Sequence, residues 1–136
     1  MKVAVFSTKA YDREFLDVAN AAGHHQLFYF EGSLRDKTVR LTEGYDAVCV
    51  FVNDVLDATV IEGLAANHVK LIVLRCAGFN NVDVEAAHRF GLRVLRVPAY
   101  SPHAVAEHAL ALVMTLNRKT HKAYNRVREG NFSIER

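Results

Sequence analysis

The 136-residue sequence has no tryptophan, only two cysteines and two prolines, and no apolar run close to the roughly 20 residues that a membrane span needs. The two cysteines, Cys49 and Cys76, are far apart and form no disulfide framework, which indicates free thiols in a reducing compartment. The N-terminus also lacks the apolar core and small-residue cleavage site of a signal peptide. These absences lead us to expect a cytoplasmic protein without a membrane partner.

Motifs for nucleic acids, phosphates and metals are missing as well. The formal net charge of +2 is too small to indicate a nucleic-acid partner, and no aromatic residues interleave with the basic ones. Neither a G-x-G-x-x-G turn nor a P-loop occurs in the sequence. His103 and His108 are five positions apart, which is roughly 140° around a helix, so they cannot chelate one metal ion together. We therefore expect no metal site and no cofactor-binding residue in this chain.

What the sequence does contain is a regular alternation of apolar runs and helical patterns. The runs predict strands at 2–7, 25–30, 45–51, 69–74 and 92–97. Helical spacing with suitable ends predicts helices at 11–22, 37–41, 57–67 and 83–90. Such alternation is typical of βαβ units, so we predict an α/β fold: a flavodoxin-like doubly wound five-stranded parallel sheet in the order 2-1-3-4-5, plus a long C-terminal helix.

The stretch around the fourth strand carries the clearest functional signal. The run 69–74 has almost no polar alternation, which is typical of a strand covered on both faces. It leads into the small residues Ala77 and Gly78, and then into a helix with Asp83 as N-cap and Gly91 as its stop. Backbone N–H groups at such a turn favour an anion, and a glycine lets a ligand approach closely. The alternative is a glycine that only completes the turn.

Three predicted strand ends can line one pocket, because the carboxyl ends of parallel strands share an edge of the sheet. This pocket offers backbone N–H donors at Ala77 and Gly78, the phenol of Tyr100 and an apolar wall at Phe51. It contains no positioned acid–base pair. His103 is the nearest titratable side chain, and in the first turn of a helix it is expected to be solvated. These four residues are therefore candidates for one ligand pocket, and none of them is a candidate for catalysis.

The last third of the chain has a different character. Ser101 and Pro102 form a strong helix start, and an apolar pattern runs from Val105 through Leu116 and more weakly to Val127. Because this helix is apolar on more than one side, it is expected to be covered by a second body. We predict a homo-oligomer formed through the helix at 102–128.

Three segments of the chain resemble the D-isomer-specific 2-hydroxyacid dehydrogenases, and among them the NAD-dependent fermentative D-lactate dehydrogenases. They are Arg-Cys-Ala-Gly-Phe-Asn-Asn-Val-Asp at 75–83, Gly-Leu-Arg-Val at 91–94, and Val-Pro-Ala-Tyr-Ser-Pro-His-Ala-Val-Ala-Glu-His at 97–108. The residues at 1–9 and 51–54 fit the same branch, so the resemblance covers essentially the whole chain. It implies an oxidoreductase that reduces a 2-oxoacid such as pyruvate to the D-2-hydroxyacid with NADH.

The resemblance also implies roles for individual residues. Ala77 and Gly78 would hold the substrate carboxylate through their N–H groups, Tyr100 would contact the substrate, and Phe51 would limit its side chain. Residues 1–100 would form the substrate domain, and 101–136 a linker helix that begins the crossing into an NAD-binding domain.

The glycine-rich loop of the family, and its catalytic arginine, glutamate and histidine, do not occur among these residues. We therefore expect a truncated family member that holds half an active site and is inactive alone. The alternative is a stand-alone flavodoxin-like module that binds a small anion without catalysis.

Overall fold

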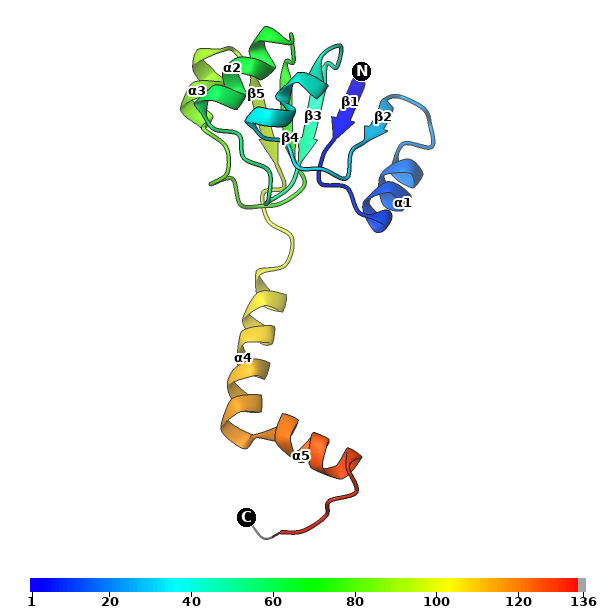
Figure 1. The fold of residues 1–136 in the computed structure, drawn as a ribbon, viewed down its shortest axis with the longest axis vertical. Coiled ribbons are helices and arrows are strands. Elements are labelled where there is room, and N and C mark those ends of the chain that lie inside the picture. The colour runs from blue at the N-terminus through cyan, green and yellow to red at the C-terminus, as the bar shows by residue number, and fades with distance from the viewer. Residues whose placement is uncertain (135–136) are drawn as a thin grey trace. The chain divides into compact units, whose positions relative to one another are not determined.

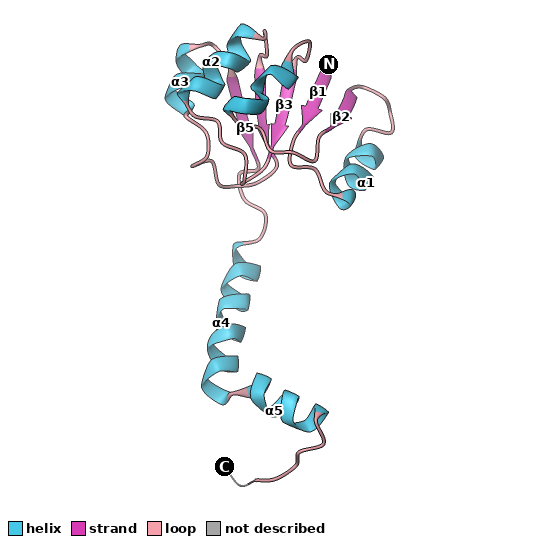
Figure 2. Cartoon of the chain, viewed as in Figure 1, coloured by secondary structure: helices cyan, strands magenta, loops and turns pink. Residues whose placement is uncertain are grey.

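Five apolar runs form a parallel sheet in the computed structural model, which describes residues 1–134 (Figure 1). The strands are β1 (Lys2–Val5), β2 (Gln26–Tyr29), β3 (Ala47–Val50), β4 (Leu71–Leu74) and β5 (Arg93–Arg96). They pair in the order β2-β1-β3-β4-β5, and every pair is parallel (Figure 2). The predicted fold class and strand order are therefore confirmed. The strands are shorter than the apolar runs, because residues at one or both ends of each run already belong to the loops that leave the sheet.

Helices connect the strands at the predicted places. They are α1 (Ala10–Ala19), the 3-10 helix η1 (Asp36–Thr42), α2 (Ala58–Ala66) and α3 (Val84–Arg89). The predicted caps are present: Asp57 accepts a hydrogen bond from the Val60 N–H at 3.0 Å, and Asp83 accepts one from the Ala86 N–H at 2.8 Å. Gly91 follows α3 with a φ of +73°, the left-handed conformation that a helix stop of this kind needs.

The two faces of the sheet are covered unequally. One face packs against α2 and α3 in a core that includes Val48, Ile72, Leu74, Ile61 and Ala87, all of them buried. The other face meets α1, which has no buried residue of its own, and a groove of about 190 Å³ remains between that helix and the strands. β4 consequently alternates between half-buried and buried positions, so the expectation that this strand is covered on both faces holds for one face only.

The chain divides into two units, Met1–Pro98 and Ala99–Arg136. The second unit holds α4 (Pro102–Arg118) and α5 (Thr120–Arg128). As predicted, the Ser101 hydroxyl caps α4 by accepting from the Ala104 N–H at 3.3 Å. The predicted continuous helix is wrong, however, because Lys119 takes a φ of 52° and separates α4 from α5. No glycine or proline marks this break in the sequence, and a left-handed lysine costs roughly 1–2 kcal/mol.

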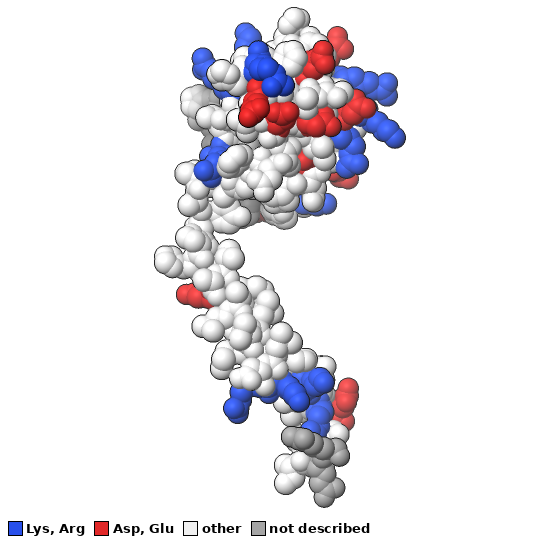
Figure 3. All heavy atoms as spheres, turned by 90° about the vertical axis from the view of Figure 1, so that its left-hand side faces the viewer, with Lys and Arg blue, Asp and Glu red and all other residues white. Residues whose placement is uncertain are grey.

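The surface of the second unit is unusually apolar along α4. Neither α4 nor α5 contains a buried residue among those described. The visible side of α4 is almost free of charged side chains, while basic side chains gather over α5 (Figure 3). Among residues 1–134, no helix combines the length and the hydropathy that crossing a membrane requires.

Candidate functional site

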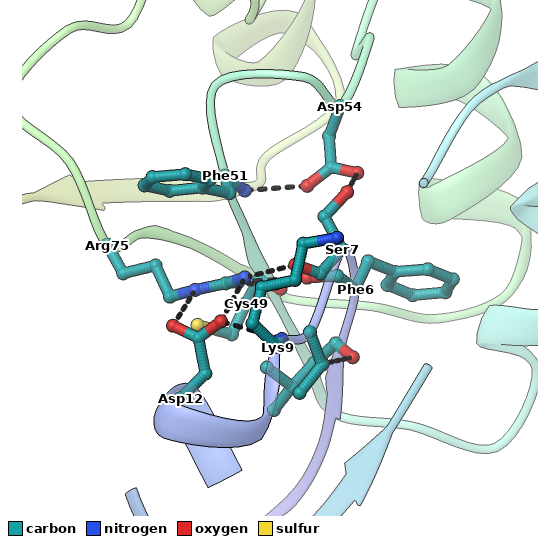
Figure 4. A network of polar contacts seen from close by, with 10 residues as sticks. Phe6, Ser7, Lys9, Asp12, Cys49, Phe51, Asp54 and Arg75 are labelled. Atoms are coloured by element: carbon teal, nitrogen blue, oxygen red, sulfur yellow. Dashed lines mark hydrogen bonds and ion pairs between the residues drawn. The ribbon is translucent and has the colours of Figure 1, made fainter. Parts of the chain in front are cut away.

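Arg75 follows β4 at the carboxyl edge of the sheet, and its guanidinium joins neighbouring segments there (Figure 4). Its Nη1 donates to the carbonyl of Phe6, and its Nη2 donates to the carbonyl of Ser7, both at 2.9 Å. Its Nε lies 3.2 Å from Oδ1 of Asp12, in the first turn of α1, and both side chains are only 13% exposed. One planar cation therefore connects the end of β1, the start of α1 and the end of β4.

Asp54 is a second polar centre of this edge, and it is completely buried. Its Oδ1 accepts from the Ser7 hydroxyl at 2.7 Å and from the Leu34 N–H at 2.7 Å, and its Oδ2 accepts from the Phe51 N–H at 2.6 Å (Figure 4). A buried carboxylate needs such donors to offset the loss of water. The side chain of Asp54 thereby fixes the loop that follows β3 to the loop that follows β1.

Ser7 shows how strongly the two centres constrain the backbone. Its φ of 52° lies in the left-handed region that residues other than glycine rarely adopt. Its N–H donates to the carbonyl of Gly32 at 2.9 Å, its carbonyl accepts from Arg75 and its hydroxyl donates to Asp54. Such a conformation persists where surrounding contacts over-determine it. Ser7 is held at three points.

Phe51, the predicted apolar wall, is held both through its backbone and through its ring. Its carbonyl accepts from the Asn81 side-chain amide at 3.0 Å, opposite the N–H bond to Asp54. The guanidinium carbon of Arg75 lies 5.1 Å from the centre of the ring, which is a cation–π distance. The half-buried ring also packs against the core, so its orientation is fixed by its neighbours.

The turn at Ala77 and Gly78 presents unpaired backbone donors. The carbonyls of Cys76, Ala77 and Gly78 each accept a hydrogen bond, from the Val97 N–H, the Arg96 guanidinium and the Cys76 thiol respectively. The N–H groups of Ala77 and Gly78, in contrast, donate to no oxygen of the described residues. Unpaired N–H groups of this kind are available to bind an anion.

Gly78 is required neither by the backbone conformation nor by packing. Its φ lies outside the left-handed region, and a Cβ placed on it would meet nothing within 4 Å. The contrast with Gly63 is informative, because a Cβ there would lie 2.8 Å from Val39. Neither the backbone conformation nor the packing therefore requires a glycine at this position, and a Cβ on Gly78 would lie in open space.

The two cysteines do not form a reactive site. Both are free and buried, and burial raises the pKa of the Cys76 thiol and that of the Cys49 thiol, although Arg75 acts in the opposite direction on each. Because the thiolate is the nucleophilic form, such thiols are poor nucleophiles. The Cys76 thiol instead donates to the carbonyl of Gly78 at 3.2 Å.

Of the four predicted site residues, Phe51, Ala77 and Gly78 lie at the carboxyl edge of the first unit, at the ends of β3 and β4. Tyr100 belongs to the second unit, where it is 70% exposed, and its role stays a prediction. His103 lies in the first turn of α4 and is exposed. Within the part of the chain that the structure describes, no group of three His, Cys, Asp or Glu side chains could hold a metal ion.

The sequence analysis missed the charged residues that organise this edge: Asp12, Asp54, Arg75 and Arg96. A signal for two of them exists in the sequence. Asp54 is the single acid of residues 47–56, which are apolar apart from Asp54 and Asn53, and Arg75 is a single cation between an apolar run and a small-residue turn. A lone charge in such a setting is expected to be paired once the chain folds, although its partner is not evident from the sequence.

Comparison with known proteins finds one family along nearly the whole chain. The family described as D-isomer specific 2-hydroxyacid dehydrogenase, catalytic domain, matches residues 3–131. A 2-hydroxyacid dehydrogenase homolog of Haemophilus influenzae is 55% identical over 135 residues, which are 99% of this chain and 41% of that protein. The chain thus spans about two fifths of the length of the curated relatives it matches.

Solved structures give the same picture. The D-lactate dehydrogenase of Escherichia coli, solved in its apo form, superposes with a TM-score of 0.82 at 52% identity, over 99% of this chain and 43% of that one. The D-lactate dehydrogenase of Lactobacillus jensenii, solved with NAD⁺, superposes with a TM-score of 0.71 at 32% identity, over 99% and 41% of the two chains. This chain shares its fold and the order of its helices and strands with both structures.

Proposed function

The chain belongs to the D-isomer-specific 2-hydroxyacid dehydrogenase family, and we propose that it supplies the half of the active site that holds the carboxylate of a 2-oxoacid. Residues 1–100 would be the substrate domain, and 101–136 the linker helix that leads into the cofactor domain. The whole protein would reduce a 2-oxoacid such as pyruvate to the D-2-hydroxyacid in the cytoplasm. NADH supplies the hydride for this reaction when it is bound.

The observation that carries this proposal is the pair of unpaired N–H groups at Ala77 and Gly78 beside open space. A carboxylate accepts two such bonds, and hydrogen bonds to a charged group contribute roughly 1.5–3 kcal/mol each. The residue without a Cβ is then the one that the ligand approaches most closely. The close approach of a ligand would explain the glycine at position 78, which neither the backbone conformation nor the packing requires.

Phe51 and Tyr100 complete the proposed half-site. The ring of Phe51 is fixed by Arg75 and by the core, so a longer substrate side chain would have to displace a held ring. This favours a small 2-oxoacid. Tyr100 belongs to the second unit, and the family resemblance implies that its phenol would contact the substrate.

Oxamate, a stable analogue of pyruvate, tests the half-site in the chain of residues 1–136. We expect its titration to shift the amide NMR signals of Ala77 and Gly78, with affinity in the millimolar range, since two bonds on an open half-site yield little more. Gly78→Val should abolish the binding without changing stability, because a Cβ there meets no protein atom within 4 Å.

Gly32→Val is the matched control, because Gly32 also lies in open space with a φ outside the left-handed region. It should bind oxamate like the wild type. Oxamate shifts confined to residues far from Ala77 and Gly78, or unchanged binding by Gly78→Val, would contradict the proposal.

Nothing in this chain is assigned to the nicotinamide cofactor. The turn after β1 is Ser7-Thr8-Lys9, which has no glycine, and the buried Thr8 hydroxyl donates back to the carbonyl of Val5. Such a turn does not fit the pyrophosphate of a dinucleotide, which needs the close backbone approach that glycines allow. We therefore expect no saturable NADH fluorescence enhancement at submillimolar concentration with this chain.

The helices of the second unit suggest a further partner, a second copy of the chain. Leu110, Val113 and Leu116 on α4 are each at least 60% exposed, and Glu107 and Arg118 are the only charged residues of this 17-residue helix. Burying a side chain of this size contributes roughly 1.5–3 kcal/mol. Association through residues 102–128 would bury several of them, and homo-oligomers commonly use such self-complementary surfaces.

A further inference from the structure

We propose that Arg96 is a positioning residue for the substrate carboxylate, because its guanidinium holds the Ala77–Gly78 peptide so that the N–H of Gly78 faces the ligand. This inference rests on the proposed function and names a residue that acts on the same site through the backbone. Arg96 is the last residue of β5, the edge strand that pairs with β4.

Peptide geometry links the contact of Arg96 to the donor. The Nη1 of Arg96 lies 3.1 Å from the carbonyl oxygen of Ala77. That carbonyl and the N–H of Gly78 belong to one planar peptide, and residues 1–134 contain no cis peptide bond. In a trans peptide the C=O and the N–H point in opposite directions. Fixing the Ala77 oxygen on one side therefore fixes the Gly78 N–H on the other.

The preceding peptide is held in the same way from the same strand end. The carbonyl of Cys76 accepts from the N–H of Val97 at 3.3 Å, which directs the N–H of Ala77 away from β5. Both proposed carboxylate donors are thus aimed by bonds that come from residues 96 and 97. The first of these bonds depends on a side chain and can be removed by substitution, whereas the second is a backbone bond.

Three further contacts keep the guanidinium of Arg96 in place although the residue is exposed. Its guanidinium carbon lies 5.2 Å from the centre of the Phe79 ring, a cation–π distance. Its Nη1 also lies 3.1 Å from the carbonyl of Pro98 and 3.4 Å from that of Val97. The side chain is therefore ordered between the turn after β4 and the end of the first unit.

The charge of Arg96 adds to its effect on orientation. A cation at a carbonyl oxygen polarises the peptide and strengthens the hydrogen bond that the N–H of the same peptide donates. Hydrogen bonds in such chains strengthen one another by roughly 10–30%. Applied to one bond to a charged carboxylate, this corresponds to about a 1.3-fold to fivefold change in affinity.

Carbonyl NMR shifts test the inference without any ligand. In the labelled chain of residues 1–136, Arg96→Met should move the ¹³C′ signal of Ala77 in the direction of a lost hydrogen bond. Arg93→Met is the matched control, because Arg93 is an exposed residue of the same strand whose side chain makes no hydrogen bond to the described residues, and its removal changes the net charge equally. It should leave the Ala77 signal unchanged.

Oxamate titration then connects the peptide to binding. Arg96→Met should weaken oxamate binding about 1.3-fold to fivefold, Arg96→Lys should fall between it and the wild type, and Arg93→Met should bind like the wild type. An unchanged Ala77 signal in Arg96→Met, or equal losses of affinity in Arg96→Met and Arg93→Met, would overturn the inference. The first result would show that Arg96 does not hold the peptide, and the second that only long-range charge matters.

The two proposals fail in different ways. If the wild-type chain shows no oxamate shifts at Ala77 and Gly78 even at tens of millimolar, the proposed carboxylate half-site is wrong. The carbonyl signal of Ala77 still decides in that case whether Arg96 holds the peptide, because it is measured in the free chain.

Discussion

Replacing Asp54 by asparagine tests whether the buried carboxylate holds together the carboxyl edge of the sheet, where Phe51, Ala77 and Gly78 lie. The substitution keeps the shape of the side chain but converts one acceptor oxygen into a donor NH₂ group. If the amide oxygen keeps the bonds from the Ser7 hydroxyl and the Leu34 N–H, the new NH₂ group faces the N–H of Phe51, which now donates to Oδ2 at 2.6 Å. Two donors then oppose each other in a site where Asp54 has no exposed surface.

The expected loss follows from these contacts. A hydrogen bond to a charged group contributes roughly 1.5–3 kcal/mol, and a buried donor without a partner costs roughly 1–3 kcal/mol. Because local rearrangement of the structure recovers part of this loss, we expect the free energy of unfolding to fall by about 2–4 kcal/mol. With a urea dependence of about 2 kcal/mol per molar, the unfolding midpoint should fall by about 1–2 M.

Pulse labelling of the two cysteines measures this change in the first unit alone, because Cys49 and Cys76 both lie there and both are buried. Asp36→Asn is the control, since Asp36 is exposed and its side chain makes no hydrogen bond to the described residues. That variant should stay within about 0.5 kcal/mol of the wild type. A midpoint of Asp54→Asn equal to that of Asp36→Asn would refute the reasoning.

Three further predictions concern other parts of the chain. Arg75→Met leaves a carboxylate and several carbonyls without their cation, so the same cysteine assay should show that the free energy of unfolding falls by about 3 kcal/mol. Arg75→Lys should be intermediate. Unchanged labelling would mean that water replaces the guanidinium. Burial and the bond to Asp17 raise the pKa of Tyr29 to about 12, so ultraviolet titration should show one late tyrosine that Tyr29→Phe removes and Asp17→Asn shifts to lower pH. Because this pKa is raised in the folded state, its contribution to stability is complete below pH 10 and is lost as the pH rises through about 12. Sedimentation at micromolar concentration should show a dimer or larger oligomer that Val113→Lys dissociates. His108→Lys is the control, because the exposed His108 lies about 140° from Val113 around the same helix, and it should leave the oligomer intact; a monomeric wild type would exclude the helix as an interface.

Local sequence signals predicted most of the fold because they depend on near neighbours. The apolar runs set the strands, Asp57, Asp83 and Ser101 begin helices, and the connections of about twenty residues force parallel pairing. The break at Lys119 has no such signal, because its left-handed backbone occurs at a residue type that rarely adopts it. The weak cover that α1 gives the sheet was also missed, since the periodicity of a helix does not report how closely it packs.

The same difference between local and long-range signals applies to the candidate site. Ala77 and Gly78 were found because a glycine at a strand end is a local feature. The partners that hold the edge were not, because Ser7 and Asp54 are separated by 47 residues and Asp12 and Arg75 by 63. Hydrogen bonds between residues so distant in sequence become visible only when the sheet order brings the strand ends together.

The parallel sheet has a consequence for the order in which the molecule assembles. β1 and β2 close a loop between partners 24 residues apart, and β3, β4 and β5 join through partners 24 and 22 residues apart, whereas β1 and β3 pair residues 44 apart. Because longer loops lose more chain entropy on closing, the chain is expected to build two halves first and then to join them. The bonds of Asp12 to Arg75 and of Ser7 to Asp54 span this seam. The bonds between the two halves are thus expected to form last, so that weakening them should accelerate unfolding in kinetic experiments while refolding keeps its rate.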